Sequence, residues 1–449
     1  MIEGKREELF TNKQIRQIAV PLFLEQFLVL LVGIADTLVV SFAGESAVSG
    51  VSLVDSFNTI MVFLFAALSA GGSVVVSQYI GRKQNEKASE AAGQLFTFAI
   101  LLSVVFTVII LPFHKQILGV LFGKVEADVM VSCIKYLKVL AFSYPALAAY
   151  NAGAAVYRSM GKTKPMMYIS IVSNLINIVG NVIGVLALKG GVLGVAYPTL
   201  ISRYFSAVVI IYLCIKGKDN MVSLQKRFVF AWNGILQKTI LKIAIPNAVE
   251  NAAHQTVKVA MSSLVSLFGT YQIAANGIAQ TIWTMSSLAG ITMGTVYITV
   301  IGRSMGTGDT GMTIDYFKRL MRQTFFFTIC WNALVFFATW GGIWVYPIEE
   351  QTKQLIVVLV LIHNVGVGLS FHFGGALSYG LRAVGDVTYT MVITLISTAI
   401  RLILSVAFAV GLGLGVIGIA LAMDIDWIFR AIFIFTRFKG GKWKKFHVI

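Results

Sequence analysis

Charged residues are scarce in this chain. Asp, Glu, Lys and Arg together make up 12% of its 449 residues, whereas 57% of the residues are hydrophobic. A soluble domain usually needs roughly a quarter of its residues charged to cover its surface. The composition therefore excludes an ordinary soluble protein and indicates a polytopic membrane protein.

Cysteine is also rare. Cys133, Cys214 and Cys330 lie far apart, without a CxxC motif and without a histidine at the spacing of a zinc ligand. This pattern indicates neither a disulfide framework nor a zinc site. The spans also lack a set of His, Cys or acidic ligands that would converge at one depth, so we expect neither an enzyme nor a bound cofactor.

Acidic residues are outnumbered, since 36 Lys and Arg face 20 Asp and Glu and give a net charge of +16. In a soluble chain this excess would suggest nucleic acid, but cytoplasmic loops of membrane proteins collect basic residues. We attribute the excess to topology and expect no nucleic-acid partner. The apolar run after residues 1–17 is longer than that of a signal peptide and lacks an A-x-A-like end, so we expect it to be retained.

Long apolar runs are what the sequence has in abundance. A helix needs about 20 mainly apolar residues to cross the hydrocarbon core, and twelve such spans predict an all-α integral membrane protein. They cover residues 15–43, 53–80, 91–112, 133–157, 166–188, 192–215, 240–268, 277–301, 322–346, 354–381, 388–411 and 415–436. The polar connection in the middle predicts an N-terminal lobe (1–215), a cytoplasmic linker (216–238) and a C-terminal lobe (239–449).

Basic residues alternate between the two ends of these spans. If the N-terminus is cytoplasmic, the inner segments hold most of the Lys and Arg, including Arg82, Lys83 and Arg227, and the outer segments hold few, such as Lys115 and Lys189. The positive-inside rule then places both termini in the cytoplasm. We expect a multi-pass protein of the cell membrane.

The first span contains a carboxylate, Asp36, well inside its apolar run. A charge inside hydrocarbon costs several kcal/mol, so such a residue normally faces a protein interior or a wet cavity and has a function. Glu25 lies eleven positions earlier, close to three helical turns, and so falls on nearly the same face. Asp36 is the first functional candidate; the alternative is a structural Asp bonded to a neighbouring helix.

The chain contains an internal duplication. Ile18-Ala-Val-Pro21 recurs as Ile243-Ala-Ile-Pro246, and at this offset of 225 positions Glu25 falls on Glu250. Three further motifs recur at offsets of 221 to 224 positions. Ile80-Gly81-Arg82 recurs as Ile301-Gly302-Arg303, and Arg158-x-x-Gly161 recurs as Arg382-x-x-Gly385. Gly191-x-x-Gly194-x-Ala196 recurs as Gly415-x-x-Gly418-x-Ala420. Duplication in an apolar chain is typical of transporters, whose substrate path lies at the repeat interface.

Together these motifs resemble the multidrug and toxic compound extrusion family, bacterial type. The resemblance rests on Pro21 with Asp36, Gly44, the Ile80-Gly81-Arg82 loop, Arg158-Ser-Met-Gly161-Lys-Thr-Lys-Pro165, Asn174 to Asn181, and the second copy from Ile243. It implies two pseudo-symmetric six-helix bundles that form a V-shaped cavity. It also implies a secondary active antiporter that exports organic cations or drugs in exchange for Na+ or H+ by alternating access.

The expected partners are a small cationic substrate and membrane lipid, and we expect a monomer. A lipid-linked oligosaccharide flippase of the same architecture is the alternative. Its anionic pyrophosphate cargo would need several basic residues within the spans, whereas the N-terminal lobe has only Arg203 there.

Asp36 matches the acidic residue that the family uses in its N-terminal lobe for cation or proton binding. Asn174, Asn177 and Asn181 form a polar stripe on one face of the fifth span. Asn177 resembles a family cation-site residue, while at Asn181 the members with the best-defined site carry an Asp. Asp36 and Asn177 are the predicted Na+ ligands, through carboxylate and amide oxygens. The alternative for the asparagines is interhelical hydrogen bonding.

Glu250, His254 and Lys258 repeat at i, i+4 and i+8 in the seventh span, with Asn251 beside them. One interpretation is a C-terminal-lobe relay in which His254 titrates near neutrality. The other is a structural ion pair in which Lys258 takes the place of a bound cation. Some family members carry acidic residues where this chain has His254 and Phe371, so the chain departs from their C-terminal-lobe sodium site.

Pro21 and Pro246 each remove one backbone hydrogen bond from a spanning helix. We expect both to be conformational hinges, and Pro21 to link the state of Asp36 to the shape of the cavity.

The other polar residues in the spans favour structural roles. His363 and His372 are nine residues apart and so lie on opposite helix faces, which excludes a shared metal from one face. Asp426 and Arg430 form an i, i+4 pair. Arg203 and Arg401 also lie within spans, and the sequence does not reveal their partners. Arg158 and Arg382 lie at the inner ends of spans, where topology alone explains them.

Overall fold

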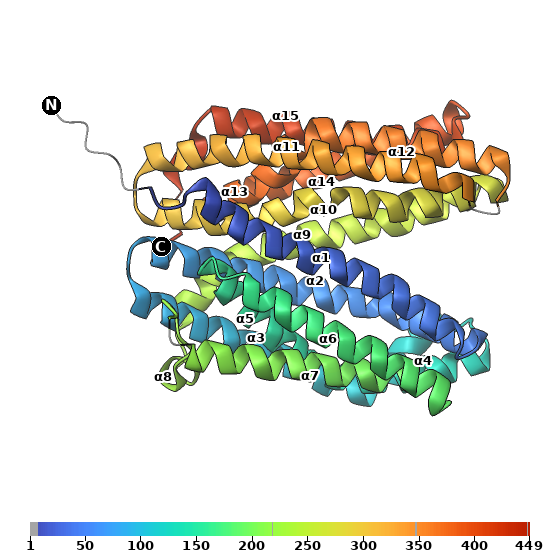
Figure 1. Cartoon of the computed structure of the whole chain (residues 1–449), viewed down its shortest axis with the longest axis horizontal. Coiled ribbons are helices and arrows are strands. Elements are labelled where there is room, and N and C mark those ends of the chain that lie inside the picture. Colours follow the sequence, from blue (N-terminus) through green and yellow to red (C-terminus); the bar gives the residue numbers. More distant parts are fainter. Residues whose placement is uncertain (1–7, 218, 346–347, 447) are drawn as a thin grey trace. The chain divides into compact units, whose positions relative to one another are not determined.

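The computed structural model describes residues 8–217, 219–345, 348–446 and 448–449, and the regular secondary structure of these residues is entirely helical (Figure 1). The α-helices are α1 (Asn12–Ser41), α2 (Glu45–Gly81), α3 (Asn85–Phe122), α4 (Ala127–Phe142), α5 (Tyr144–Ser159), α6 (Lys164–Val182), α7 (Leu193–Lys216), α8 (Lys226–Val229), α9 (Gly234–Val265), α10 (Thr270–Gly306), α11 (Thr310–Gly342), α12 (Glu350–Phe371), α13 (Leu377–Val384), α14 (Val387–Val406) and α15 (Gly415–Lys439). The π-helical and 3-10 segments are η1 (Ile183–Ala187), η2 (Ile343–Val345), η3 (His372–Ala376), η4 (Ala407–Gly411) and η5 (Lys442–Lys445).

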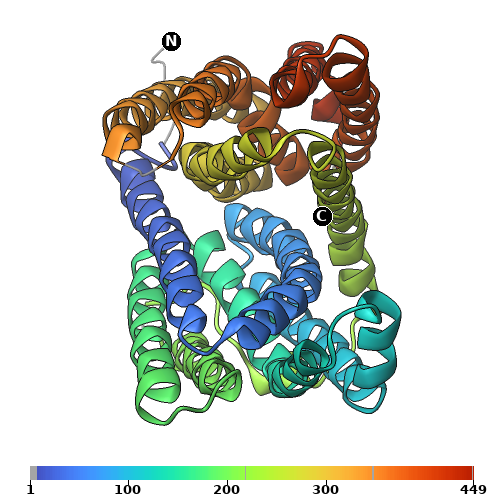
Figure 2. The ribbon, with the colours of Figure 1, turned by 90° about the vertical axis from the view of Figure 1, so that its right-hand side faces the viewer.

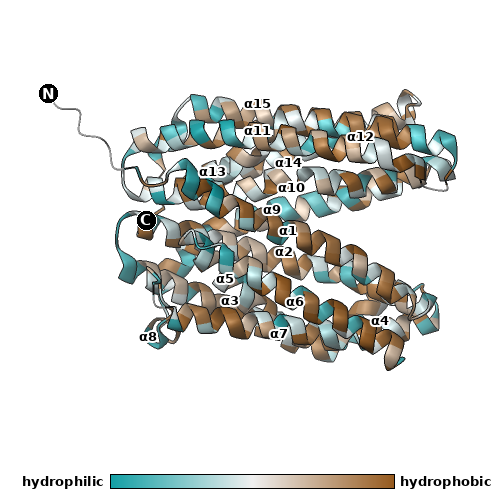
Figure 3. Cartoon of the chain, viewed as in Figure 1, coloured by the Kyte–Doolittle hydropathy of each residue, from teal (hydrophilic) through white to brown (hydrophobic). Residues whose placement is uncertain are grey.

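Each of the twelve predicted spans coincides with one helix or with a helix and its continuation. Among the described residues, nine helices are long and apolar enough to cross a membrane, or ten if α4 and α5, bent by 46° at their junction, form one span. Two further predicted spans, α9 and α15, are not among these: α9 is less apolar, and α15 carries the charged residues Asp424, Asp426 and Arg430 in its interior. Figure 3 shows hydrophobic residues along the helices and hydrophilic ones concentrated toward their ends. Helices suit this setting because they satisfy their own backbone hydrogen bonds in hydrocarbon.

The chain divides into two compact units. We call Val20–Ile245 the N-terminal unit, and Pro246–Ile449 with residues 8–19 the C-terminal unit. The boundaries therefore fall inside α1 and α9, next to their prolines, and segment 216–238 belongs to the N-terminal unit. In that unit α5 lies against α2, α3 and α7, and in the C-terminal unit α10 lies against α11, α12 and α13. Figure 2 shows the helices of each unit as a bundle.

The duplication is visible in the backbone as well as in the sequence. The π-helical segments η1 and η4 occupy equivalent places before the short connections to α7 and α15. Gly161 and Gly385, the glycines of the two Arg-x-x-Gly motifs, both adopt a positive φ, of 71° and 102°. The π-helical segments and the positive-φ glycines therefore recur at equivalent positions, so the two copies share their local backbone conformation as well as their motifs.

The glycines of the Gly-x-x-Gly-x-Ala motifs permit a close helix approach in each unit. A Cβ atom on Gly194 would lie 2.6 Å from the carbonyl carbon of Gly184, and one on Gly418 would lie 2.7 Å from the backbone nitrogen of Ala409. No side chain fits at either distance, so the sequence needs glycine where α7 meets η1 and where α15 meets η4.

We expect Gly194→Ala to lower the stability of the protein by about 1–3 kcal/mol, because the backbone of η1 must move away from the new methyl group. The measurement is the apparent Tm of the purified protein in detergent. Gly119→Ala is the matched control, since a Cβ atom at Gly119 meets nothing within 4 Å. An unchanged Tm for Gly194→Ala would contradict the close approach.

Candidate functional site

Asp36 lies in the N-terminal unit, where it meets α6. The Asn181 side chain donates a hydrogen bond from Nδ2 to Asp36 Oδ1 at 2.8 Å. Asn181 is fully buried, while Asp36 is partly exposed. The carboxylate therefore faces a neighbouring helix of its own unit, which fits the cost of leaving a charge against hydrocarbon.

Asn177 lies one turn before Asn181 on α6 and completes the contact with Asp36. The Asn177 amide satisfies both of its ends when Nδ2 donates to Asp36 Oδ1 at 2.9 Å and Oδ2 at 3.0 Å and Oδ1 accepts from Thr199 Oγ1 at 3.1 Å. We assign this orientation. Asn177 is 7% exposed, so a carboxylate, two amides and a hydroxyl from α1, α6 and α7 meet in one mostly buried cluster, which we call the Asp36 cluster.

The donor set of the Asp36 cluster decides which ligands suit it. Its oxygens come from one carboxylate, two amides and one hydroxyl, which are hard ligands for a small cation such as Na+. The carboxylate can alternatively take a proton. Among the described residues, no group of three or more His, Cys, Asp or Glu side chains could hold a metal ion. The cluster therefore offers hard oxygen atoms and one carboxylate that can take up a proton.

The predicted asparagine stripe divides in the structure. Asn174 donates to Ser170 Oγ at 3.3 Å, one turn back on the same helix, whereas Asn177 and Asn181 turn to Asp36. Thr199 joins the cluster although the sequence did not indicate it, because a single Thr in an apolar span carries no distinguishing signal.

A second polar group lies in the same unit. The Tyr136 hydroxyl donates to Asp55 Oδ1 at 3.4 Å, and Arg203 Nη1 donates to Ser143 Oγ at 2.7 Å. Arg203 is close enough to Asp55 to act on its charge. The structure thus places the lone arginine of the sixth span near a carboxylate of the second, while its hydrogen bond goes to Ser143.

In the C-terminal unit, the three ionisable residues of α9 have different surroundings. Glu250 is paired with Arg382 and accepts from Thr390 Oγ1 at 3.1 Å. His254 Nε2 lies 3.4 Å from Arg430 Nη1. Lys258 is exposed and forms no ion pair with any described residue. The side chain of Asn251 makes no hydrogen bond within the described part of the chain.

His254 belongs to a charged group between α9, α14 and α15. Arg430 binds Asp426 at 3.1 Å and 3.2 Å, which is the expected i, i+4 pair. Arg401, at the place equivalent to Asn177, acts on the charges of Asp426 and of Asp424, a residue that the sequence analysis did not single out. The C-terminal unit therefore has the guanidinium of Arg401 where the N-terminal unit has the Asn177 amide.

The histidines of the tenth span lie among aromatic rings. His363 lies 6.3 Å from the ring of Trp427, and His372 lies 4.9 Å from the ring of Phe325. Both are buried, as interior histidines with structural roles would be.

Pro21 and Pro246 lie inside α1 and α9, well past the first turn of each helix. Topology alone does not explain Arg158 and Arg382, because they form ion pairs with the buried Glu25 and Glu250. The duplication in the sequence includes both glutamates and both arginines, but it does not show that they pair.

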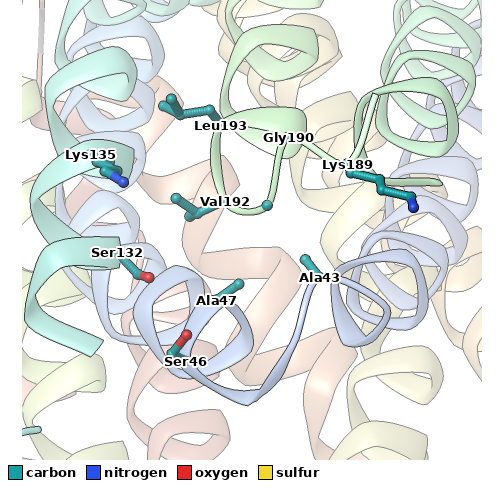
Figure 4. Close-up of a pocket in the computed structure, with 10 residues that line it drawn as sticks. Ala43, Ser46, Ala47, Ser132, Lys135, Lys189, Gly190, Val192 and Leu193 are labelled. Carbon is teal, nitrogen blue, oxygen red and sulfur yellow. The ribbon is translucent and has the colours of Figure 1, made fainter. Parts of the chain in front are cut away.

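A pocket of about 260 Å³ lies at one end of the N-terminal unit (Figure 4). Lys135 and Lys189 lie at its edges. Its lining is Ala43, Ser46, Ala47, Ser132, Lys135, Lys189, Gly190, Gly191, Val192 and Leu193. None of the predicted site residues lines it, so this pocket is separate from the Asp36 cluster.

Two helical units with a duplicated design, spans of membrane length and a buried carboxylate–amide cluster define a membrane transporter of the internal-repeat class. Comparison with known proteins is specific. The family model MatE matches residues 21–183 and 246–425, one match in each copy. The chain belongs to the MatE family, that is, the multidrug and toxic compound extrusion family, whose members are transporters and not enzymes.

Individual relatives are distant but match over nearly the whole chain. The probable multidrug resistance protein NorM of Thermotoga maritima is 24% identical over 98% of this chain and 95% of its own length. The uncharacterized transporter YisQ of Bacillus subtilis is 26% identical over 94% and 93%. These matches confirm the family resemblance seen in the motifs.

Solved structures show the same fold. A structure described as an outward-facing conformation of a multidrug resistance MATE family transporter has a TM-score of 0.89, is 21% identical, and matches 96% of both chains. A MATE structure in complex with MaL6 has the same TM-score and identity and matches 96% of this chain and 97% of its own. The prediction of an all-α integral membrane protein is confirmed.

Proposed function

We propose that this protein is a secondary active antiporter that exports organic cations or drugs in exchange for Na+ or H+. Family membership and relatives named as multidrug resistance proteins support an exporter of drugs. The observation that carries the coupling part of the proposal is the Asp36 cluster. A coupling ion needs a site that is buried, acidic and able to change its charge, and Asp36 with Asn177 and Asn181 meets these requirements.

The amides give the cluster two ways of holding the carboxylate. With their nitrogens toward Asp36, Asn177 and Asn181 stabilise its charge by donated hydrogen bonds. Turned by half a rotation, the same amides present oxygens, which are ligands for Na+. A protonated Asp36 would instead donate to an amide oxygen. Both candidate coupling ions therefore act through the same three side chains.

Pro21 and Pro246 are the hinges of the proposed mechanism. Each lies in a helix that passes from one unit to the other. A helix that has lost one backbone hydrogen bond bends more easily at that point. Occupancy of Asp36, fifteen residues beyond Pro21, can then bias the shape of α1.

For the C-terminal unit we propose no coupling site. Arg401 holds a permanent charge at the place equivalent to Asn177, and His254 faces the guanidinium of Arg430. Positive charges in these two places disfavour a bound cation. Lys258 is exposed and forms an ion pair with neither Glu250 nor any other described residue, so the pairing of Glu250 with Arg382 replaces the expected pairing with Lys258.

The alternative cargo, a lipid-linked oligosaccharide, is less well supported. A pyrophosphate headgroup needs arginines that are not already neutralised. Arg158 and Arg382, at the ends of their spans, and Arg430, within its span, are each paired with a carboxylate. We therefore favour a cationic cargo, and we further propose a monomer with both termini in the cytoplasm.

We expect everted membrane vesicles that contain the protein to accumulate a cationic dye when an ion gradient is imposed. The proton gradient and the sodium gradient are then collapsed in separate experiments. Uptake should stop in only one of the two experiments, because a single small ion drives the exchange. The readout is dye fluorescence, with vesicles from cells lacking the protein as the control. Uptake that persists without both gradients would overturn the antiport mechanism.

A further inference from the structure

The two units contain equivalent ion pairs, each between a buried glutamate and an arginine whose side chain is 22% exposed in Arg158 and 12% exposed in Arg382. Arg158 Nη2 lies 3.0 Å from Glu25 Oε1 in the N-terminal unit, and Arg382 Nη2 lies 2.5 Å from Glu250 Oε2 in the C-terminal unit. The two glutamate side chains are only 4% and 3% exposed. The pairs thus follow the internal duplication, with offsets of 225 and 224 positions.

Each glutamate lies four residues after the proline of its helix. The boundary between the units falls close to that proline in both helices: after Ala19 in α1, with Val20 between it and Pro21, and after Ile245 in α9, directly before Pro246. Glu25 and Glu250 are therefore held about one helical turn past the point where the chain enters its new unit.

The part of each helix before the proline is also held, by the unit that it leaves. Before α1, the Phe10 backbone N–H donates to Tyr316 Oη at 2.7 Å, and Arg319 Nη1 donates to the Phe10 carbonyl at 3.0 Å, all within the C-terminal unit. At the start of α9, Gln237 Nε2 donates to Gln94 Oε1 at 3.0 Å within the N-terminal unit. Both helices are fastened on both sides of their proline.

A helix fastened at two places and weakened between them bends at the weak place. Proline removes one backbone hydrogen bond and so supplies the weak place. An ion pair buried in the unit resists displacement because separating its charges leaves each of them unpaired. The bend is thereby confined to the turn around Pro21 and the turn around Pro246.

We infer that the ion pairs Glu25–Arg158 and Glu250–Arg382 are duplicated anchors that fix α1 and α9 just past their prolines, which makes these four residues positioning residues for transport. The inference rests on the proposed antiport function, since it concerns how bending of α1 and α9 is confined during that cycle. Asp36, three turns beyond Glu25, keeps its register against α6 because the anchor holds the helix between the proline and the cluster.

The test is a set of variants of the full-length protein. Glu25→Gln and Arg158→Gln each leave one buried charge unpaired, so both should lower the apparent Tm. The double variant Glu25→Gln with Arg158→Gln has no unpaired charge and should regain stability. At saturating dye, this double variant should nevertheless transport at least about fivefold more slowly than the wild type, because the anchor is missing. Its affinity for the dye should be unchanged. The charge-reversed double variant, Glu25→Arg with Arg158→Glu, should regain both stability and rate.

The exposed ion pair Glu86–Arg227, 2.8 Å long with side chains 72% and 61% exposed, is the matched control. Its neutral double variant should change neither the Tm nor the transport rate, because exposed pairs contribute little.

A second measurement does not depend on transport. Spin labels at Lys13 and Val29, both exposed and on either side of Pro21, should give a narrow distance distribution in the otherwise wild-type protein with its three cysteines replaced. In the neutral double variant the distribution should broaden. A wild-type rate and an unbroadened distribution in that variant would overturn the anchor role. A wild-type protein that does not transport would refute the antiport function. The anchor role would then still be tested by comparing the spin-label distance distributions of the wild type and the neutral double variant.

Discussion

Asp36→Asn is expected to abolish ion-driven efflux while the protein remains folded in the membrane. The Asn side chain keeps the size of Asp but has one carbonyl oxygen and one NH2 group in place of two carboxylate oxygens. It can therefore neither take up a proton near neutral pH nor neutralise a cation. Losing the charge from a buried, hydrogen-bonded site costs about 2–5 kcal/mol, which corresponds to a loss of at least about 30-fold in rate. The measurement is gradient-driven dye uptake by everted vesicles.

The control for this variant is Glu45→Gln, which removes the same charge at the exposed start of α2. It should transport like the wild type, so that any difference reflects the location of Asp36 and not the net charge. The apparent Tm and the elution profile of both purified variants report folding. Full transport by Asp36→Asn would leave the Asp36 cluster without a coupling role.

Asn177→Arg is expected to lower transport at least about tenfold by filling the Asp36 cluster with a permanent cation. The substitution copies the C-terminal unit, where Arg401 occupies the equivalent place. The introduced guanidinium would pair with the carboxylate, which lies 2.9 Å and 3.0 Å from the Asn177 amide. Uptake should therefore fail with either gradient, because Na+ and H+ need the same carboxylate.

Asn174→Arg is the matched control, one turn away on the same helix, where the native side chain bonds to Ser170 and not to Asp36. It should retain more transport than Asn177→Arg if the effect depends on contact with Asp36. Combining Asn177→Arg with Asp36→Asn should lower the apparent Tm below that of Asn177→Arg alone, because the guanidinium then has no partner. Equal losses in Asn174→Arg and Asn177→Arg would contradict a local effect.

The fold was readable from composition and spacing. Apolar runs of membrane length predict helices without any tertiary information, because hydrocarbon leaves the backbone no other partners. The duplication was readable as well, since the repeated motifs correspond to repeated conformations, such as the positive φ of Gly161 and Gly385. Family membership followed from the same motifs.

The Asp36 cluster was only partly readable. Asp36 stands out because a carboxylate in an apolar span is rare, and Asn177 and Asn181 stand out through their helical spacing. Thr199 and the separation of Asn174 from the stripe could not be foreseen, because the rotation of α6 against α1 and α7 decides which side chains meet.

The sequence by itself determined that this chain spans a membrane with helices, that it is built twice over, and that a few polar residues lie inside its spans. These properties follow from local composition and periodicity, which need no partner. Only the tertiary structure decided the pairings, including Glu25 with Arg158 and Glu250 with Arg382. Partners more than a hundred residues apart are chosen by how the helices pack, and a buried charge reveals its need for a partner but not which helix provides it.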